Sequence, residues 1–443
     1  MKAVKVSFAV LVALLMAMGI TTQAQAFHSG GVAECEGCHS MHNSFEGSAN
    51  VTGMAQYQSG IYLLKAQDQS GACLNCHNAA DTVGSSYHIS TAGVTPLDST
   101  IPVELTPGGD FAWLKKTMTG SIRKTATTWD GDRHGHNIVA VDFGYTADKV
   151  LTTAPGSSSG YPAGALACSS CHDPHGRYRR LADGTEVLTG LPIFASGSYT
   201  SSIAPTAGVS AVGVYRLLGG VGYQPKSLAG ALAFSNPTPS AVAPSNYNAT
   251  SNVTAAGVAD RVGYGSGMSE WCQNCHSVMH NDIYVSGTKG SVHPAGNGAK
   301  LTAPIAANYA AYVSSGIMTG TGAGYSALAP FETGATKTLA DITALKAFQA
   351  APTAPATTSN VSCLSCHRSH ASGFESMTRY YLGNEFMTVA DASNVAIYDT
   401  STTENKINTG YSTAQQTAAY NGRPATVFGP WARNYCNKCH AKD

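Results

Sequence analysis

Every cysteine of this chain lies in one five-residue pattern, Cys-x-x-Cys-His, which occurs six times along 443 residues. The twelve cysteines are Cys35, Cys38, Cys73, Cys76, Cys168, Cys171, Cys272, Cys275, Cys363, Cys366, Cys436 and Cys439, and the histidines that follow them are His39, His77, His172, His276, His367 and His440. The copies are called motifs 1 to 6 in chain order. Two thiols at this spacing reach the two vinyl groups of one porphyrin, and the adjacent histidine reaches its iron, so the pattern indicates attachment of c-type haem. The sequence therefore predicts six covalent haems and leaves no thiol for a disulfide.

A single Cys-x-x-Cys pair is also typical of half a zinc site or of a redox-active dithiol. Neither alternative requires a histidine directly after the second cysteine, yet that histidine is present in all six copies. We interpret the chain as a hexahaem cytochrome c in which the six motif histidines are the proximal iron ligands.

The first residues have the pattern of a secretory signal peptide. A positively charged start precedes an apolar run at 8–20 and an Ala-x-Ala ending at Ala26. The run is too short to span a bilayer, and no second run of spanning length follows. We expect cleavage of residues 1–26, export through the periplasm, and a single hexahaem domain over residues 27–443 that does not span the membrane.

The composition excludes some partners and predicts a loop-rich fold. Charged residues make up 12% of the chain and the formal net charge is zero, which argues against a nucleic-acid partner because such proteins need a basic face. The chain has 47 Gly and 19 Pro, and tracts such as 154–160 and 235–239 consist of small and turn-forming residues. We expect a multihaem cytochrome fold of mostly irregular coil, with a few short helices and very little strand, wrapped around a chain of six haems that supply the core.

Some local elements can still be predicted. Each motif should form one helical turn that presents its histidine. Residues 332–348 contain one helix candidate, and a weak strand-like alternation is found at 138–143.

Nine histidines lie outside the motifs, enough to provide a second ligand to six irons. They are His28, His42, His88, His134, His136, His175, His280, His293 and His370. Iron with two histidine ligands has no open position for a substrate and can only exchange electrons. Axial methionine would raise the potential, but the supply of histidine makes it unnecessary.

Three of these histidines, His42, His175 and His370, follow a motif histidine by three residues. The porphyrin blocks such a side chain from the far face of its own haem, so each is expected to reach the iron of a neighbouring haem. A solvated surface histidine is the alternative for each of them.

The other candidates rest on their surroundings. His88 and His293 lie in otherwise uncharged loops and are predicted to be ligands. Of the close pair His134 and His136, the second has less charged neighbours and is preferred. His28 and His280 are kept in reserve.

One possible cation site lies in the same region as that pair. Asp130 and Asp132 could bind a cation, but two carboxylates in a loop are more often simply solvated.

Several segments resemble the hexahaem outer-surface cytochromes of metal-reducing bacteria. They are residues 27–34 and 41–44 around motif 1, 170–176 at motif 3, 267–272 at motif 4, 293–298, and the end at 436–443. The resemblance covers essentially the whole mature chain. It implies very little regular secondary structure, two histidines on every iron, and protomers stacked end to end into a filament with one continuous chain of haems. It also implies that His42 ligates the haem of His367 in the next protomer.

These observations predict an extracellular electron-transfer protein rather than an enzyme. Electrons would enter from an outer-membrane donor complex and leave to metal oxides or partner cells. A monomeric periplasmic carrier is the first alternative, but no charged docking patch is visible. A multihaem reductase of nitrite, hydroxylamine or sulfite is the second; it needs one open iron, often marked by a replaced motif histidine, and all six motifs keep theirs.

Overall fold

The computed structural model describes residues 35–40, 44–45, 48–49, 63–78, 88–91, 100–157, 160–195, 197, 199–228, 232–244, 261–279, 293–314, 324–399 and 407–440. The signal peptide predicted at 1–26 lies outside these ranges. Among the helices that they contain, none has both the length and the apolar character needed to cross a membrane.

Most of the described chain is coil, and its helices are short. The α-helices are α2 (Cys35–Cys38), α3 (Gln69–His77), α4 (Met268–Cys272), α5 (Ala303–Ser314), α6 (Leu339–Ala350), α7 (Cys363–Cys366), α8 (Thr413–Ala419) and α9 (Cys436–Cys439). Single 3₁₀ turns are η2 (Phe111–Trp113), η3 (Gly131–His134), η4 (Val141–Phe143), η5 (Ala163–Ala165), η6 (Cys168–Ser170), η7 (Tyr215–Leu217), η8 (Lys226–Leu228), η9 (Glu375–Met377) and η10 (Ala425–Val427). The prediction of a coil-rich fold with a few short helices is confirmed.

Strands are few and mostly two or three residues long. They are β1 (Ser44–Phe45), β2 (Ser48–Ala49), β3 (Met118–Ile122), β4 (Thr125–Trp129), β5 (Arg179–Arg180), β6 (Glu186–Val187), β7 (Ile193–Ala195), β8 (Ala211–Gly213), β9 (Ala241–Val242), β10 (Gly263–Tyr264), β11 (Val389–Ala390), β12 (Ala396–Ile397) and β13 (Ile407–Asn408). The larger sheets have the orders β13-β3-β4 and β6-β5-β8-β7. In the β3–β4 hairpin, Arg123 and Lys124 have φ of 47° and 70°, as a type I′ turn requires.

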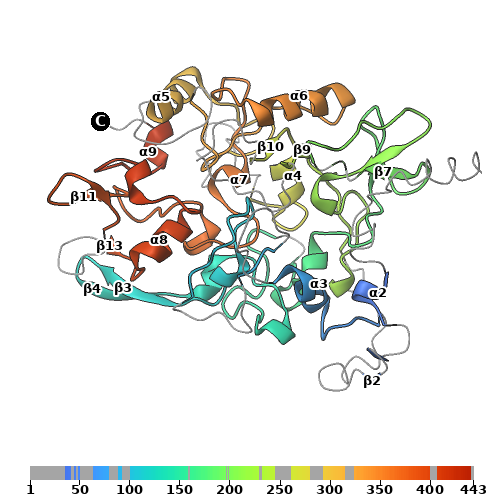
Figure 1. Ribbon diagram of the computed structural model, residues 1–443, viewed down its shortest axis with the longest axis horizontal. Coiled ribbons are helices and arrows are strands. Elements are labelled where there is room, and N and C mark those ends of the chain that lie inside the picture. The colour runs from blue at the N-terminus through green and yellow to red at the C-terminus, as the bar shows by residue number, and fades with distance from the viewer. Residues whose placement is uncertain are drawn as a thin grey trace, which may run out of the picture.

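The motifs form short helical segments, as predicted. Figure 1 shows α2 toward one end of the longest axis, α3, α4 and α7 in the middle part, and α9 toward the other end. Motif 3 begins with the 3₁₀ turn η6 in place of an α-helix.

The helix predicted within 332–348 is present as α6, which begins at Leu339 because the Thr338 side chain accepts a hydrogen bond from Asp341 N. The strand suggested at 138–143 is absent: Val141–Phe143 form η4. The physical reason is a tight turn, in which Ala140 pairs with Tyr145 and Gly144 adopts a left-handed φ of 72°.

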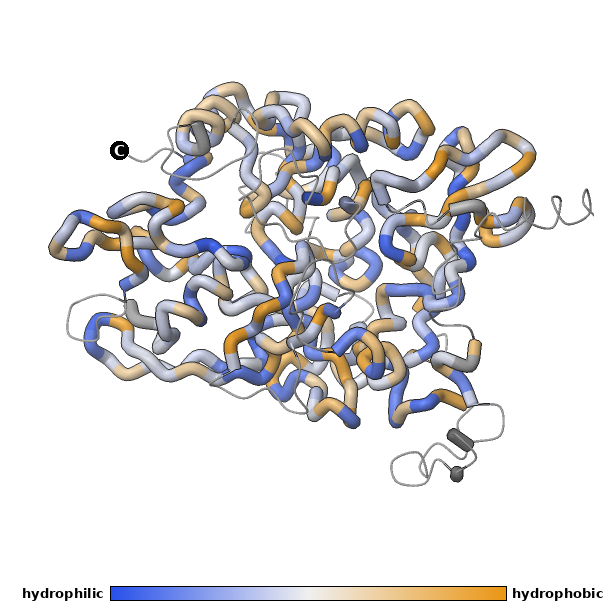
Figure 2. Tube along the Cα trace, viewed as in Figure 1, coloured by the Kyte–Doolittle hydropathy of each residue, from blue (hydrophilic) through white to orange (hydrophobic). Residues whose placement is uncertain are grey.

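The protein buries more of its own side chains than the sequence suggested. One large cluster contains seven tyrosines, namely Tyr145, Tyr309, Tyr380, Tyr398, Tyr411, Tyr420 and Tyr435. Three of the hydroxyl groups donate to loop carbonyls: Tyr309 to Ala329 O at 3.0 Å, Tyr398 to Arg423 O and Tyr411 to Gly373 O, each at 2.5 Å. Tyrosine suits a coil-rich interior because its ring is apolar and its hydroxyl satisfies backbone groups that no helix or sheet pairs. Apolar residues are accordingly spread in short segments along the coloured part of the trace (Figure 2).

Candidate haem sites

The local fold of each motif explains its spacing. In motifs 1, 3, 4, 5 and 6 the N–H of the motif histidine donates to the carbonyl of the first cysteine, at 2.8 to 3.0 Å. Residues i, i+3 and i+4 share one side of such a turn. Both thiols and the imidazole can therefore attach to one porphyrin.

Neighbouring motifs touch through their cysteines. The sulfur atoms of Cys73 and Cys168 lie next to each other, which joins motifs 2 and 3. Cys272 and Cys363 join motifs 4 and 5 in the same way. Cys171 and Cys275 are neighbours at the join between motifs 3 and 4.

The contact between motifs 2 and 3 and the contact between motifs 4 and 5 contain the same kind of hydrogen bond, which the spacing of residues in the sequence does not reveal. Ser70 Oγ accepts the N–H of Cys168 at 3.2 Å, and Ser269 Oγ accepts the N–H of Cys363 at 3.0 Å. Each serine lies three residues before the first cysteine of its own motif. The two joins are therefore built alike.

Four motif histidines each face a histidine from outside the motifs. The ring centres are 6.4 Å apart for His39 and His175, 6.4 Å for His172 and His370, 6.1 Å for His276 and His136, and 6.0 Å for His440 and His293. Two imidazoles on opposite sides of one metal ion have centres about 6.2 Å apart, given bonds of about 2 Å and about 1.1 Å from nitrogen to ring centre. The four pairs therefore have the spacing of two axial ligands of one iron.

Backbone contacts leave one nitrogen available for a metal in four of the eight paired rings and in His367. Nδ1 donates to Arg216 O in His172, to Pro155 O in His276 and to Ser369 O in His136, each at 2.7 Å. His293 Nδ1 donates to Pro294 O at 2.9 Å, and His367 Nδ1 to Ser376 O at 2.8 Å. A proton held on Nδ1 leaves the lone pair of Nε2 free to bind iron, which is the usual role of such carbonyl contacts around a metal.

The structure separates His134 from His136. The His134 ring is buried, its Nδ1 donates to Trp113 O at 3.1 Å, and burial lowers its pKa to about 4. Gly135 between them allows the backbone to approach the 370–371 segment, since a Cβ there would lie 2.3 Å from His370 O. The preferred residue of the pair, His136, is therefore the one that faces a motif histidine.

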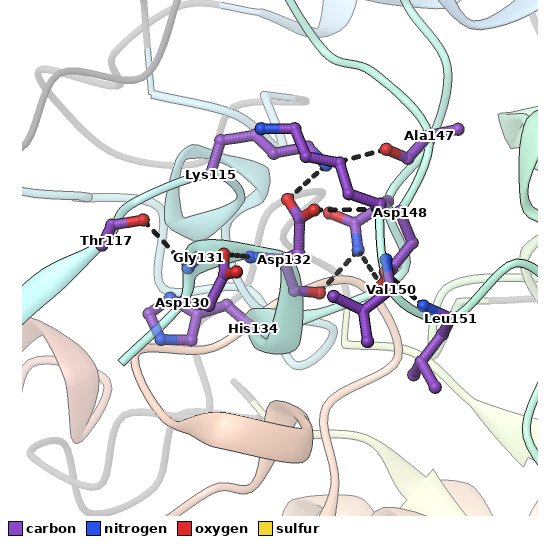
Figure 3. Close-up of polar contacts among 12 residues, drawn as sticks. Lys115, Thr117, Asp130, Gly131, Asp132, His134, Ala147, Asp148, Val150 and Leu151 are labelled. Carbon is purple, nitrogen blue, oxygen red and sulfur yellow. Dashed lines mark hydrogen bonds and ion pairs between the residues drawn. The ribbon is translucent and has the colours of Figure 1, made fainter. Parts of the chain in front are cut away.

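Asp130 and Asp132, the possible cation site of the sequence analysis, lie at the turn η3 and have partners within the protein. Asp132 is buried and forms an ion pair with Lys115 at 2.5 Å, and Asp130 Oδ1 accepts the N–H of Asp132. Asp148 closes the next loop by accepting the N–H groups of Val150 and Leu151. Figure 3 shows this network around the turn that precedes His136.

The remaining predicted ligands are placed less completely. His28, His42 and His280 lie outside the described residues. His88 lies beside motif 2, where Ile89 N donates to His77 O at 3.0 Å, and its role as a ligand stays a prediction. No imidazole of the described chain faces the His367 ring.

Two buried arginines next to motif 5 were missed by sequence reasoning. Arg368 and Arg379 are 2% and 1% exposed, neither forms an ion pair within the described ranges, and their Nη2 atoms have no hydrogen-bond partner. Burial and the nearby Arg379 lower the pKa of Arg368. A buried guanidinium group needs an anion, and the carboxylates of a haem are suitable partners. An arginine directly after a motif histidine was the available signal.

The facing histidines and the motif cysteines fit haem better than a bare metal ion. Nowhere in the described residues do three or more His, Cys, Asp or Glu side chains gather in a way that could hold one. Pairs of imidazoles beside pairs of thiols suit an iron whose other ligands come from a porphyrin. The fold and sites define a multihaem c-type cytochrome.

Comparison with known proteins agrees with this class. The chain is 54% identical over 448 residues to the C-type cytochrome OmcS of Geobacter sulfurreducens, covering all of both chains. It superposes on the cryo-EM structure of OmcS nanowires from that organism with a TM-score of 0.82 at 54% identity, covering 94% of this chain and 100% of that one. A second structure, of an Outer Membrane Cytochrome S filament from Geobacter sulfurreducens, gives 0.79 at 53% identity with the same coverage. No family model matches the chain. The chain belongs to the family of the C-type cytochrome OmcS.

Proposed function

We propose that this chain carries six c-type haems, each iron with two histidine ligands, and polymerises end to end into a filament that conducts electrons outside the cell. The observation that carries the proposal is the set of four facing histidine pairs, distributed over motifs that follow one another across the molecule. The filament structures of the relatives support the polymer. Haem iron supplies one-electron transfer, and the protein sets ligands, burial and spacing.

The proximal ligands are the six motif histidines, and the distal ligands are His42, His88, His136, His175, His293 and His370. The four observed pairs support the choice of His136, His175, His293 and His370. His88 then remains for motif 2, with His28 and His280 as the next candidates. Because every iron is closed, the protein is an electron-transfer protein and not an enzyme.

The pairs also support a bond between protomers. His370 follows motif 5 and faces the histidine of motif 3, and His175 follows motif 3 and faces the histidine of motif 1. In both cases the histidine that follows a motif faces the motif two places earlier in the chain. For motif 1 no such motif exists in the same protomer, so the equivalent partner belongs to the adjacent protomer. This arrangement brings His42 to motif 5 of the adjacent protomer, whose His367 faces no second imidazole in the described chain.

The route and the partners follow from this function. The signal peptide at 1–26 sends the chain to the periplasm and then to the cell surface. An outer-membrane complex donates electrons, and metal oxides or partner cells accept them.

Electron microscopy of protein sheared from cells tests the polymer, and EPR with carbon monoxide binding tests the irons. We expect filaments and entirely low-spin haem that binds no carbon monoxide. Dispersed monomers with low-spin haem would favour the periplasmic carrier, and one stoichiometric carbon monoxide site would favour a reductase.

A further inference from the structure

Three buried oxygen atoms lie close to the join between motifs 4 and 5 without any hydrogen-bond donor. They are Oε2 of Glu332, Oε2 of Glu270 and Oδ1 of Asn360. Glu332 is 1% exposed and Asn360 is 3% exposed. Buried acceptors normally have partners, so three together require an explanation.

The backbone brings these side chains together. Glu332 and Asn360 form an antiparallel bridge with reciprocal N–H to O bonds of 3.0 and 2.9 Å. Residues directly opposite in such a pair project to the same face. Glu332 Oε1 accepts the N–H of Met268 at 2.9 Å, two residues before Glu270 on α4.

Each carboxylate has one satisfied oxygen and one orphaned oxygen. Glu270 Oε1 accepts the N–H of Asn297 at 2.8 Å. Neither glutamate forms an ion pair with a lysine or arginine of the described chain. Two carboxylates in one buried site repel each other, so one of them keeps its proton or a cation must enter.

The oxygen count favours a proton over a metal ion. A calcium ion takes about 6–8 oxygen ligands, and only three oxygens here are left without a donor. A proton, in contrast, needs only one oxygen to which it binds and one further oxygen that accepts its hydrogen bond. An O–H group on Glu332 Oε2 would donate to Asn360 Oδ1 or to Glu270 Oε2, so that one proton satisfies two of the three oxygens.

We propose that Glu332 and Glu270 form a proton-binding site, and that one proton enters it when an electron reaches the haem attached at Cys272 or at Cys363. The proposal rests on the function proposed above. The electron comes from the preceding haem and reduces ferric to ferrous iron, while the proton comes from solvent and binds Glu332 Oε2. On reoxidation both leave.

The groups facing Glu332 explain the coupling. Glu270 on α4 is its charged neighbour, Cys363 on α7 is the adjacent haem-attachment residue, and the N–H groups of Gly267 and Met268 also face it. Cys363 in turn contacts Cys272 and Ser269. An added electron at this join makes the site more negative and raises its proton affinity. Burial already raises the pKa of Glu332 to about 8, so uptake falls in the neutral to mildly alkaline range.

Spectroelectrochemical titration of the haem-loaded protein between pH 6 and 9 tests the coupling. We expect the potential of at least one haem to fall as pH rises, with a limit of about 59 mV per tenfold change in proton concentration for one electron and one proton. Glu332→Gln, whose amide can still donate to Asn360, should remove that slope. Glu270→Gln removes the like charge and should move the slope to lower pH.

The control is Glu385→Gln, an exposed glutamate paired with Arg433, which should leave the slope unchanged. Redox-difference infrared spectra should show a protonated carboxyl band that Glu332→Gln abolishes. An unchanged slope in folded Glu332→Gln, or stoichiometric calcium in the purified protein, would overturn the proposal. Low-spin spectra and filaments of the same samples report separately on the function.

Discussion

At the scale of single residues, two of the proposed distal ligands are mechanically linked. His136 N donates to His370 O at 2.9 Å, and His136 Nδ1 donates to Ser369 O. His370 itself faces His172, and its ring stacks on Phe111 at 4.6 Å. The segment that supplies a ligand to motif 3 therefore also orients the ligand of motif 4.

Substitution of the two neighbouring histidines should separate ligation from packing. His136→Ala should leave the iron of His276 with one protein ligand, producing one high-spin haem that binds carbon monoxide. His134→Ala should keep all haems low-spin but lower the free energy of unfolding by roughly 1–3 kcal/mol, because Trp113 O loses its buried donor. EPR and denaturant unfolding measure the two effects. The reverse pattern would make His134 the ligand.

The sequence allowed some of these residue roles to be predicted. Motif spacing predicts the attachment residues without the fold, because the chemistry is local. The choice of His136 over His134 rested on neighbouring charge, and the structure places that histidine opposite His276. The need for an anion at Arg368 could not be predicted, since it depends on burial against Thr106 and Pro107, far away in the chain.

At the scale of elements, the short helices of the motifs are stabilised more by contacts with one another than by the hydrogen bonds within each helix. Helices of four or five residues have little stability alone. Ser269 on α4, which is fully buried, accepts the N–H that begins α7, and Ser70 does the same between α3 and η6. The sequence predicted these turns from the cysteine spacing, but not their pairing, because the partners lie about a hundred residues apart.

Removing one of these contacts should loosen one join. Ser269→Ala leaves the N–H of Cys363 without its acceptor, and we expect a loss of roughly 1–3 kcal/mol in the free energy of unfolding. Guanidinium unfolding followed by haem absorbance measures it. Ser201→Ala, at an exposed position, is the matched control, and equal stability of both variants would show that the contact contributes nothing.

At the scale of the whole molecule, the motifs form a line whose first member lies toward one end (Figure 1). In the proposed ligation, His370 beside motif 5 would bind the iron of motif 3, and His175 beside motif 3 would bind the iron of motif 1. Such bonds would cross-link distant parts of a fold with little sheet or helix, in a way that the spacing of residues in the sequence does not reveal. Only the last step of that series, from motif 1, needs a second protomer.

His42→Ala tests that step. The variant should be secreted with six haems but form no filaments or short, fragile ones, because the bond that aligns adjacent protomers is lost. One iron per protomer, that of His367, should become high-spin. Added imidazole should restore its low-spin spectrum without restoring the filaments, since a free ligand cannot join two chains. His280→Ala is the comparison variant. Normal filaments and unchanged spectra in His42→Ala would assign the ligand to a different histidine, with His28 and His280 as the next to examine.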